Sequence, residues 1–179
     1  SDTAKAQMQG VGLFSSRRLR MRFSENIVLT DSTSFSISDS LGNPYADAYP
    51  LYRLPHENYV LFAQSQEPLA EEISYEVLVE NIGDVAGNST DSTTYSFTGT
   101  AQSDTTAQRF IQRSRQAGIY PNEALEFIYA KPITEEVIRD SLKVVEGTKL
   151  IENWPNTNIS RNRFFVEPRE SWQEGLDYE

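Results

Sequence analysis

Apolar and polar residues alternate along most of the chain. Leu19, Met21 and Phe23, for example, alternate with three arginines. A two-residue period places the apolar side chains of a strand on one face, so each such segment is expected to be a half-buried strand. The segments with this period, or with many β-branched and aromatic residues, are 18–23, 34–38, 59–63, 75–79 and 94–98. The pattern predicts an all-β protein with antiparallel strands.

Helical patterns are few. Residues 108–115 have some helix propensity, but they directly precede a strand-like run, and we expect a strand there. Thr134 is a suitable N-cap residue for a single helical turn over residues 135–140. Short strands separated by turn residues, such as residues 41–44, are typical of a β-sandwich.

The chain contains an internal repeat. Apolar positions near residue 20 recur 106 residues later, and later positions recur at slightly different offsets. Such self-similarity indicates that one structural unit occurs twice, although two alternating stretches can also resemble each other by chance. The matched positions are Gly12-Leu13-Phe14 with Gly118-Ile119-Tyr120, Leu19 with Leu125, Met21 with Phe127, Phe23 with Tyr129, Ile27 with Ile133, Phe35 with Leu142, Ile37 with Val144, residues 59–61 with 164–166, Leu69 with Trp172, Ile73 with Leu176, and Tyr75 with Tyr178.

The repeat predicts two tandem domains. Residues 1–100 form a complete copy, residues 101–107 have the Thr- and Ser-rich composition of a linker, and residues 108–179 form a second copy that lacks its last two strands. Missing strands expose a sheet edge. We therefore expect the second copy to be completed by another chain, by chain exchange or by neighbouring domains of the parent protein, and a homodimer through the exposed edges is one such arrangement.

Three segments of the first copy together resemble a known family. They are Phe23-Ser24-Glu25-Asn26-Ile27 after an alternating strand, the leucine and aromatic stretch from Leu69 to Tyr75, and the turn Gly83-Asp84-Val85-Ala86-Gly87-Asn88. This combination resembles the bacterial Ig-like domain of the S-layer protein type. The second copy keeps only a variant of the first segment, at residues 129–133, and lacks the Asp-x-x-Gly-Asn turn.

The resemblance carries expectations about both fold and function. It implies an Ig-like antiparallel β-sandwich of about seven strands. It also implies a secreted or cell-surface protein, and hence an extracellular or cell-envelope location. Domains of this family serve as spacer, adhesion or accessory modules and have no catalytic site of their own.

Composition narrows the function further. The 179 residues carry 26 Asp and Glu against 16 Lys and Arg, a formal net charge of -10, which disfavours binding to nucleic acid or to anionic membranes. The chain has no Cys, which excludes disulfides, thiol nucleophiles and thiolate metal sites. Because no apolar run is long enough for a membrane-spanning helix, we expect no membrane insertion.

Signals for catalysis are absent from the sequence. His56 is the only imidazole, and no Gly-x-Ser-x-Gly or phosphate-binding loop motif is present. The carboxylate pairs at residues 71–72 and 135–136 are adjacent in sequence, so their side chains are expected to point to different sides of a solvated surface. We predict no catalytic residues, no bound cofactor and no enzymatic activity.

Two segments are candidates for ligand binding. The turn around Asp84 and Asn88 suits an Asx-turn, and its oxygens are also possible ligands for calcium. Trp154, flanked by the amides Asn153 and Asn156, has the composition of a sugar-binding platform, although a tryptophan at the edge of a core gives the same pattern.

The arginines of residues 18–22 offer another candidate surface. Arg18, Arg20 and Arg22 are expected on the outer face of one strand, where ion pairs with Glu76 and Glu80 on a neighbouring strand would explain them.

Together these features favour a non-catalytic structural or adhesion module. The alternatives are a carbohydrate-binding accessory module of a larger extracellular enzyme and a fragment of an enzyme whose catalytic domain lies elsewhere.

Overall fold

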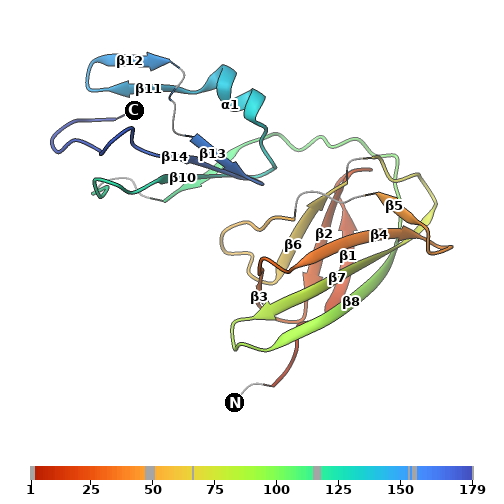
Figure 1. The fold of residues 1–179 in the computed structure, drawn as a ribbon. Coiled ribbons are helices and arrows are strands. Elements are labelled where there is room, and N and C mark those ends of the chain that lie inside the picture. Colours follow the sequence, from red (N-terminus) through yellow and green to blue (C-terminus); the bar gives the residue numbers. More distant parts are fainter. Residues whose placement is uncertain are drawn as a thin grey trace. The chain divides into compact units, whose positions relative to one another are not determined.

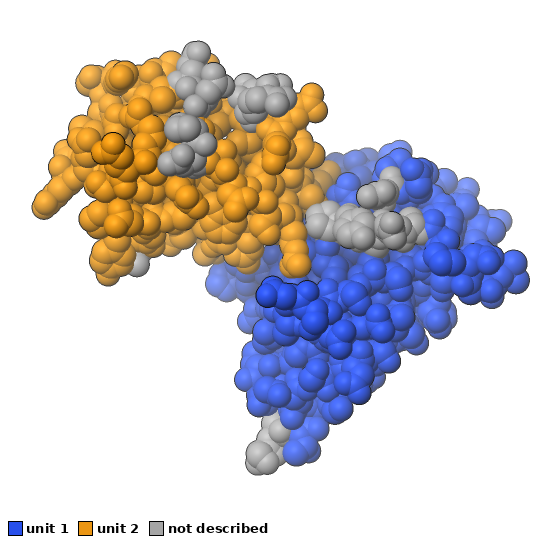
Figure 2. All heavy atoms as spheres, in the orientation of Figure 1, with its two compact units in different colours: residues 1–107 blue, residues 108–179 orange. Residues whose placement is uncertain are grey.

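The computed structural model describes residues 3–46, 51–65, 67–114, 118–152, 154 and 157–178. The chain is all-β, every strand pair between named strands is antiparallel, and the one helix among the described residues is short. It divides into two compact units, residues 1–107 (unit 1) and residues 108–179 (unit 2), which Figure 2 colours separately. No helix within the described residues is long and apolar enough to cross a membrane.

Unit 1 consists of two antiparallel sheets (Figure 1). In the first sheet β2 lies between β1 and β6, and in the second β7 pairs with β8 on one edge and with β3 and β4 on the other, while β5 extends β4. The strands are β1 (Met8–Leu13), β2 (Arg18–Phe23), β3 (Ile27–Val28), β4 (Ser34–Asp39), β5 (Pro44–Ala46), β6 (Val60–Gln64), β7 (Ser74–Asp84) and β8 (Ser89–Thr98). Each of the five segments predicted from alternation lies in one of these strands or overlaps it closely.

The core of unit 1 joins its two sheets. Met21 of β2 and Leu61 of β6 pack in one cluster with Val77 and Val79 of β7, and all four are fully buried. The sheets therefore pack face to face, as in a β-sandwich. Burial of each side chain of this size contributes roughly 1.5–3 kcal/mol, and alternation along β2 and β7 supplies these side chains to the interior.

Unit 2 contains one larger sheet, one hairpin and the helix. The sheet has the order β13-β14-β10-β9, and β11 pairs with β12. The elements are β9 (Phe110–Arg113), β10 (Leu125–Tyr129), α1 (Glu135–Ser141), β11 (Lys143–Glu146), β12 (Lys149–Glu152), β13 (Thr157–Ser160) and β14 (Arg163–Val166). The strand expected within residues 108–115 is confirmed as β9. The helical turn is confirmed as α1, whose N-cap Thr134 accepts a hydrogen bond from the Val137 amide at 3.5 Å.

The two units share a bulged, three-stranded framework. β10 lies between β9 and β14, as β2 lies between β1 and β6. In unit 1 one extra residue, Gln9, lies opposite the step from Arg22 to Phe23. In unit 2 the extra residue, Ile111, lies opposite the step from Ile128 to Tyr129, which is the same step 106 residues later. Alternation alone does not require a bulge at this step, so chance similarity of alternating stretches does not account for it.

Hydrogen bonds outside the paired strands recur as well. Each bond of unit 1 in the following set has a counterpart in unit 2 between residues at equivalent positions of the fold. The pairs are Phe23 N to Tyr59 O with Tyr129 N to Asn162 O, Ser24 N to Gln7 O with Ala130 N to Arg109 O, Ile27 N to Asn58 O with Ile133 N to Arg161 O, Leu69 N to Ser16 O with Trp172 N to Pro121 O, and Ala70 N to Tyr75 Oη with Gln173 N to Tyr178 Oη.

Two predicted matches of the repeat are wrong. Residues 59–61 do not correspond to residues 164–166, because Leu61 pairs with Met21 whereas Phe164 pairs with Phe127, which makes Phe164 the counterpart of Leu61. The match of Gly12 with Gly118 is wrong as well. Gly12 lies in β1, whereas Gly118 follows β9 in the connection to β10. The counterpart of β1 is β9, at an offset of 102 residues, because the connection that follows is longer in unit 2. The offset of 106 holds from Leu19 to Ile27, since loop insertions and deletions on either side change the numbering without changing the pairing.

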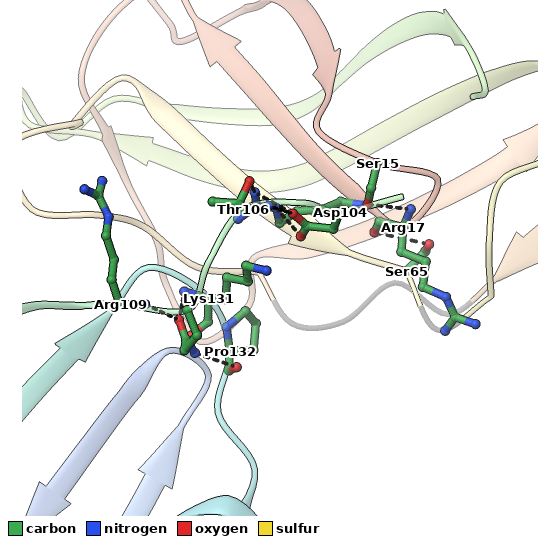
Figure 3. A network of polar contacts seen from close by, with 10 residues as sticks. Ser15, Arg17, Ser65, Asp104, Thr106, Arg109, Lys131 and Pro132 are labelled. Carbon is green, nitrogen blue, oxygen red and sulfur yellow. Dashed lines mark hydrogen bonds and ion pairs between the residues drawn. The ribbon is translucent and has the colours of Figure 1, made fainter. Parts of the chain in front are cut away.

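Residues 101–107, predicted to be a linker, are bonded to unit 1. Arg18 is buried, and its guanidinium lies 3.1 Å from a carboxylate oxygen of Asp104 and donates to the Thr106 hydroxyl at 2.7 Å. Figure 3 labels these two partners, Asp104 and Thr106. The Phe14 ring lies 4.5 Å from the same guanidinium. Arg18 is therefore on the outer face of β2, as alternation predicts, but the chain after β8 covers it.

The ion pairs expected between the arginines of β2 and the glutamates of β7 are absent from the described contacts. β2 and β7 belong to different sheets, so their outer faces point away from each other. Arg20 instead lies 3.7 Å from the carboxylate of Glu57, and Glu80 accepts a hydrogen bond from Ser34 at 3.0 Å.

Candidate functional site

A cleft of about 390 Å³ opens beside two buried tryptophans of unit 2. We call it the aromatic cleft. Three parts of unit 2 form it: the end of β11, the segment around Trp154, and the chain that follows β14. Its walls include Glu146, Trp154, Arg169, Trp172 and Tyr178.

Trp154 contributes to the cleft from a buried position. Only 5% of the residue is exposed, and its indole nitrogen donates to the Glu167 carbonyl at 2.7 Å. Its ring stacks on Trp172 with 5.9 Å between centroids, and the Arg169 guanidinium lies 5.1 Å from the ring centroid. The side chain is thus an anchor of the unit 2 core and not an open platform, while its environment borders the cleft.

Polar groups line the opening of the same cleft. Arg169 donates to Glu146 at 3.1 Å, and the Tyr178 hydroxyl donates to the other oxygen of that carboxylate at 3.2 Å. Arg169 remains largely exposed, with 45% of its side chain accessible. A carboxylate, a guanidinium and aromatic edges together are suited to hydrogen bonding with hydroxyl-rich ligands.

The sequence points to only part of this cleft. Asn153 and Asn156, the predicted companions of Trp154, lie outside the described residues. Trp172 and Tyr178 were matched to core positions of the repeat, and nothing in the local sequence connects them with Trp154. The bridge between Tyr178 and Glu146 brings the end of the chain to the cleft.

The other candidate, Asp84, is engaged within its own turn. One carboxylate oxygen accepts hydrogen bonds from the backbone amides of Ala86 and Asn88, both at 2.8 Å, and the other accepts from the Asn88 side chain at 2.8 Å. Gly87 has a φ of 87°, which only glycine adopts without strain. These contacts form an Asx-turn that closes the β7–β8 hairpin.

The pKa of Asp84 reflects this environment. Burial by itself raises the pKa of the carboxyl, but the hydrogen bonds from the Asn88 side chain and from the amides of Asn88, Ala86 and Gly87 outweigh burial, and the net pKa is lowered. No three His, Cys, Asp or Glu side chains of the described residues are grouped as a metal site would require. Calcium binding by Asp84 and Asn88 stays a prediction.

The same turn occurs a second time in unit 1. Asp39 accepts hydrogen bonds at 2.9 Å from the amides of Leu41 and Asn43 and from the Asn43 side chain. The side-chain hydrogen bond from Asn43 is the largest cause of the lowered pKa of Asp39. The same Asp-x-x-Gly-Asn turn thus closes two hairpins, at residues 39–43 and 84–88. This recurrence indicates a structural role for the turn.

The remaining residues considered for chemistry are dispersed. His56 is exposed in a turn, where its φ is 69°. Residues 71–72 are exposed before β7, and residues 135–136 are exposed in the first turn of α1.

The sequence matches no known family model and no curated protein.

Proposed function

We propose that this chain is a non-catalytic structural or adhesion module of a secreted or cell-surface bacterial protein. In this proposal, units 1 and 2 are tandem Ig-like domains of the S-layer protein type, and the second is incomplete. The observation that carries the proposal is the repeated three-stranded framework with its bulge at the same step. Tandem copies of one sandwich are an arrangement that spacer and adhesion proteins use.

The physical character of unit 1 supports this role. β7 and β8 pair along most of their length, from Ser74–Thr98 to Gly83–Ser89. Long antiparallel ladders, tight Asx-turns and a buried apolar core give a rigid body with no need for a moving part. Rigidity of this kind suits a domain that separates or presents other domains.

Two measurements test the proposal. Antibodies raised against residues 1–107 should label intact bacterial cells that carry the gene, or bind protein in their culture medium. Purified chain should show no turnover above buffer on panels of glycoside, ester and peptide substrates. Labelling that requires permeabilised cells would contradict the location, and turnover that is lost in His56→Ala but kept in Tyr59→Phe would contradict the non-catalytic role.

The aromatic cleft favours a second candidate function, that of a carbohydrate-binding accessory module. Its support is the grouping of Glu146, Arg169 and Tyr178 beside the two tryptophans. Trp154→Ala should abolish glycan binding, but it also removes a core side chain. Arg169→Ala is the better test because this side chain is exposed, and Lys149→Ala, on the exposed β12, is the matched control. Glycan binding that survives Arg169→Ala unchanged would argue against the cleft.

A further inference from the structure

A second hollow of unit 2 lies along β11 and shares Trp172 and Tyr178 with the aromatic cleft. Its volume is about 260 Å³, and we call it the strand groove. Most of its lining is apolar and comes from β10, β11, β14 and the chain that follows β14. The principal side chains are Leu125, Phe127, Leu142, Val144, Val166 and Trp172.

In unit 1 the corresponding positions are covered by another strand. Leu19 and Met21, the counterparts of Leu125 and Phe127, are both 0% exposed. Leu125 and Phe127 are only partly buried, although they hold the same places in the repeated framework. The difference arises from what lies above them and not from the apolar character of the side chains.

In unit 1 the covering element is β7. β7 runs antiparallel to β4, with Val77 opposite Ile37. Val77 and the next inward residue, Val79, join Met21 in the core. The counterpart of Ile37 in unit 2 is Val144, in β11. The strand groove is therefore the place that a β7-like strand takes in unit 1.

The start of that strand position is already occupied. Tyr178 forms a bridge with Glu146, as Tyr75 at the start of β7 pairs with Asp39. The Tyr178 hydroxyl also accepts from the Gln173 amide at 3.2 Å, the bond that matches Ala70 to Tyr75. Among the described residues, the edge of β11 opposite β12 carries no strand pairing beyond this bridge.

We propose that the strand groove seats an extended polypeptide segment, which runs antiparallel to β11 in line with Tyr178. Its inward positions are apolar, because Phe127 and Val144 face them. Its outward positions favour acidic residues, because Lys143, next to the inward Val144 on β11, faces outward at the border of the groove. This is strand addition to an open sheet edge, in which backbone hydrogen bonds supply affinity and alternate side chains supply selectivity.

The occupant is a segment of a separate polypeptide with this alternating pattern, and not a second copy of this chain. The segment of this chain with the required pattern is β7, where Val77 and Val79 alternate with Glu76, Leu78 and Glu80. In folded unit 1, β7 is hydrogen-bonded on both edges, and Val77 and Val79 are fully buried. The inference depends on the match between β11 and β4 and is independent of the adhesion role.

A peptide with the sequence of β7, residues 74–84, is the direct probe, mixed with the 179-residue chain. Trp154 and Trp172 are the only tryptophans of the chain and both lie in unit 2, so tryptophan emission reports on unit 2 alone. We expect saturable binding of one peptide per chain, a change in emission because Trp172 lines the groove, and a higher midpoint for the thermal transition seen by tryptophan.

Matched peptides test the side-chain pattern. A peptide with Val77→Asp and Val79→Asp places charges at the inward positions and should lose binding at least tenfold. A peptide with Leu78→Ser changes only an outward position and should keep its affinity. Equal binding of these two peptides would overturn the proposal, because it would show that the groove does not distinguish inward from outward side chains.

Variants of the chain test the location. Lys143 is exposed, and Lys143→Glu should weaken binding of the acidic β7 peptide about two- to fivefold. Lys149→Glu, on β12, is the control with the same charge change and should leave binding unchanged. Absence of peptide binding to folded chain overturns the proposal, as does a concentration-dependent dimer that Lys143→Glu disrupts, which would make a second copy the occupant. Neither result bears on cell-surface location, which the antibody experiment decides separately.

Discussion

The open groove makes a quantitative prediction about two leucines that hold the same place in the repeat. Leu19 is 0% exposed in the core of unit 1, whereas Leu125 is partly buried on the wall of the strand groove. Truncation of a fully buried leucine to alanine costs about 2–5 kcal/mol, because it removes apolar contact and leaves a cavity. At Leu125 a hollow already exists, so only part of the transfer free energy is lost, about 1 kcal/mol.

Urea denaturation measures the difference. With an m-value of about 1.5 kcal/mol per molar urea, a loss of about 3 kcal/mol in Leu19→Ala lowers the midpoint of unit 1 by about 2 M. Leu125→Ala should lower the midpoint of unit 2 by about 0.7 M on the same basis. Tryptophan emission follows unit 2, and far-ultraviolet circular dichroism follows both units.

A particular result would refute this reasoning. If Leu125→Ala reduces the free energy of unfolding as much as Leu19→Ala does, Leu125 is covered as fully as Leu19. The strand groove is then not an open site. The saturating β7 peptide provides a second comparison. With the peptide bound, Leu125 becomes more deeply buried, so the loss caused by Leu125→Ala should increase toward the value for Leu19→Ala.

Other regions of unit 1 give further predictions. Because the pKa of Asp84 is lowered in the folded protein, its carboxylate stabilises unit 1 at pH values above the usual aspartate pKa of about 3.9, and this stabilisation is lost as the pH falls through the folded pKa. Urea midpoints measured from pH 5 to 2.5 should therefore fall less steeply in Asp84→Asn than in the parent chain. Gly99→Ala should destabilise unit 1 by about 1–3 kcal/mol or more, because a Cβ there overlaps the Ala70 carbonyl oxygen; a thermal midpoint equal to that of the parent chain would contradict the packing. Arg18→Met removes the partner that holds residues 101–107, and limited proteolysis should then cut this segment faster, whereas an unchanged rate would mean that other contacts hold it.

Much of the strand content follows from local alternation. The order of apolar and polar residues in β2 is enough to assign Leu19, Met21 and Phe23 to one face, and they are buried together. The capping residue Thr134 likewise marks the start of α1. These features depend on residues close together in the sequence, where conformational preference and side-chain direction are coupled.

Other features depend on contacts between distant segments. Alternation places Arg18 on the outer face of β2, but its burial depends on Asp104 and Thr106, which lie beyond β8. The partners expected for the arginines were wrong because alternation does not reveal that β2 and β7 belong to different sheets.

The aromatic cleft and the strand groove show the same division. Sequence alone identifies Trp154 as an aromatic residue in a polar loop, and it identifies Tyr178 as the counterpart of Tyr75. Only the tertiary structure stacks Trp154 on Trp172 and pairs Tyr178 with Glu146, leaving the edge of β11 without a strand partner among the described residues. The physical reason is that a periodic pattern specifies which face of a strand is apolar, whereas the element that covers this face is selected by loop lengths and by packing between segments far apart in the chain.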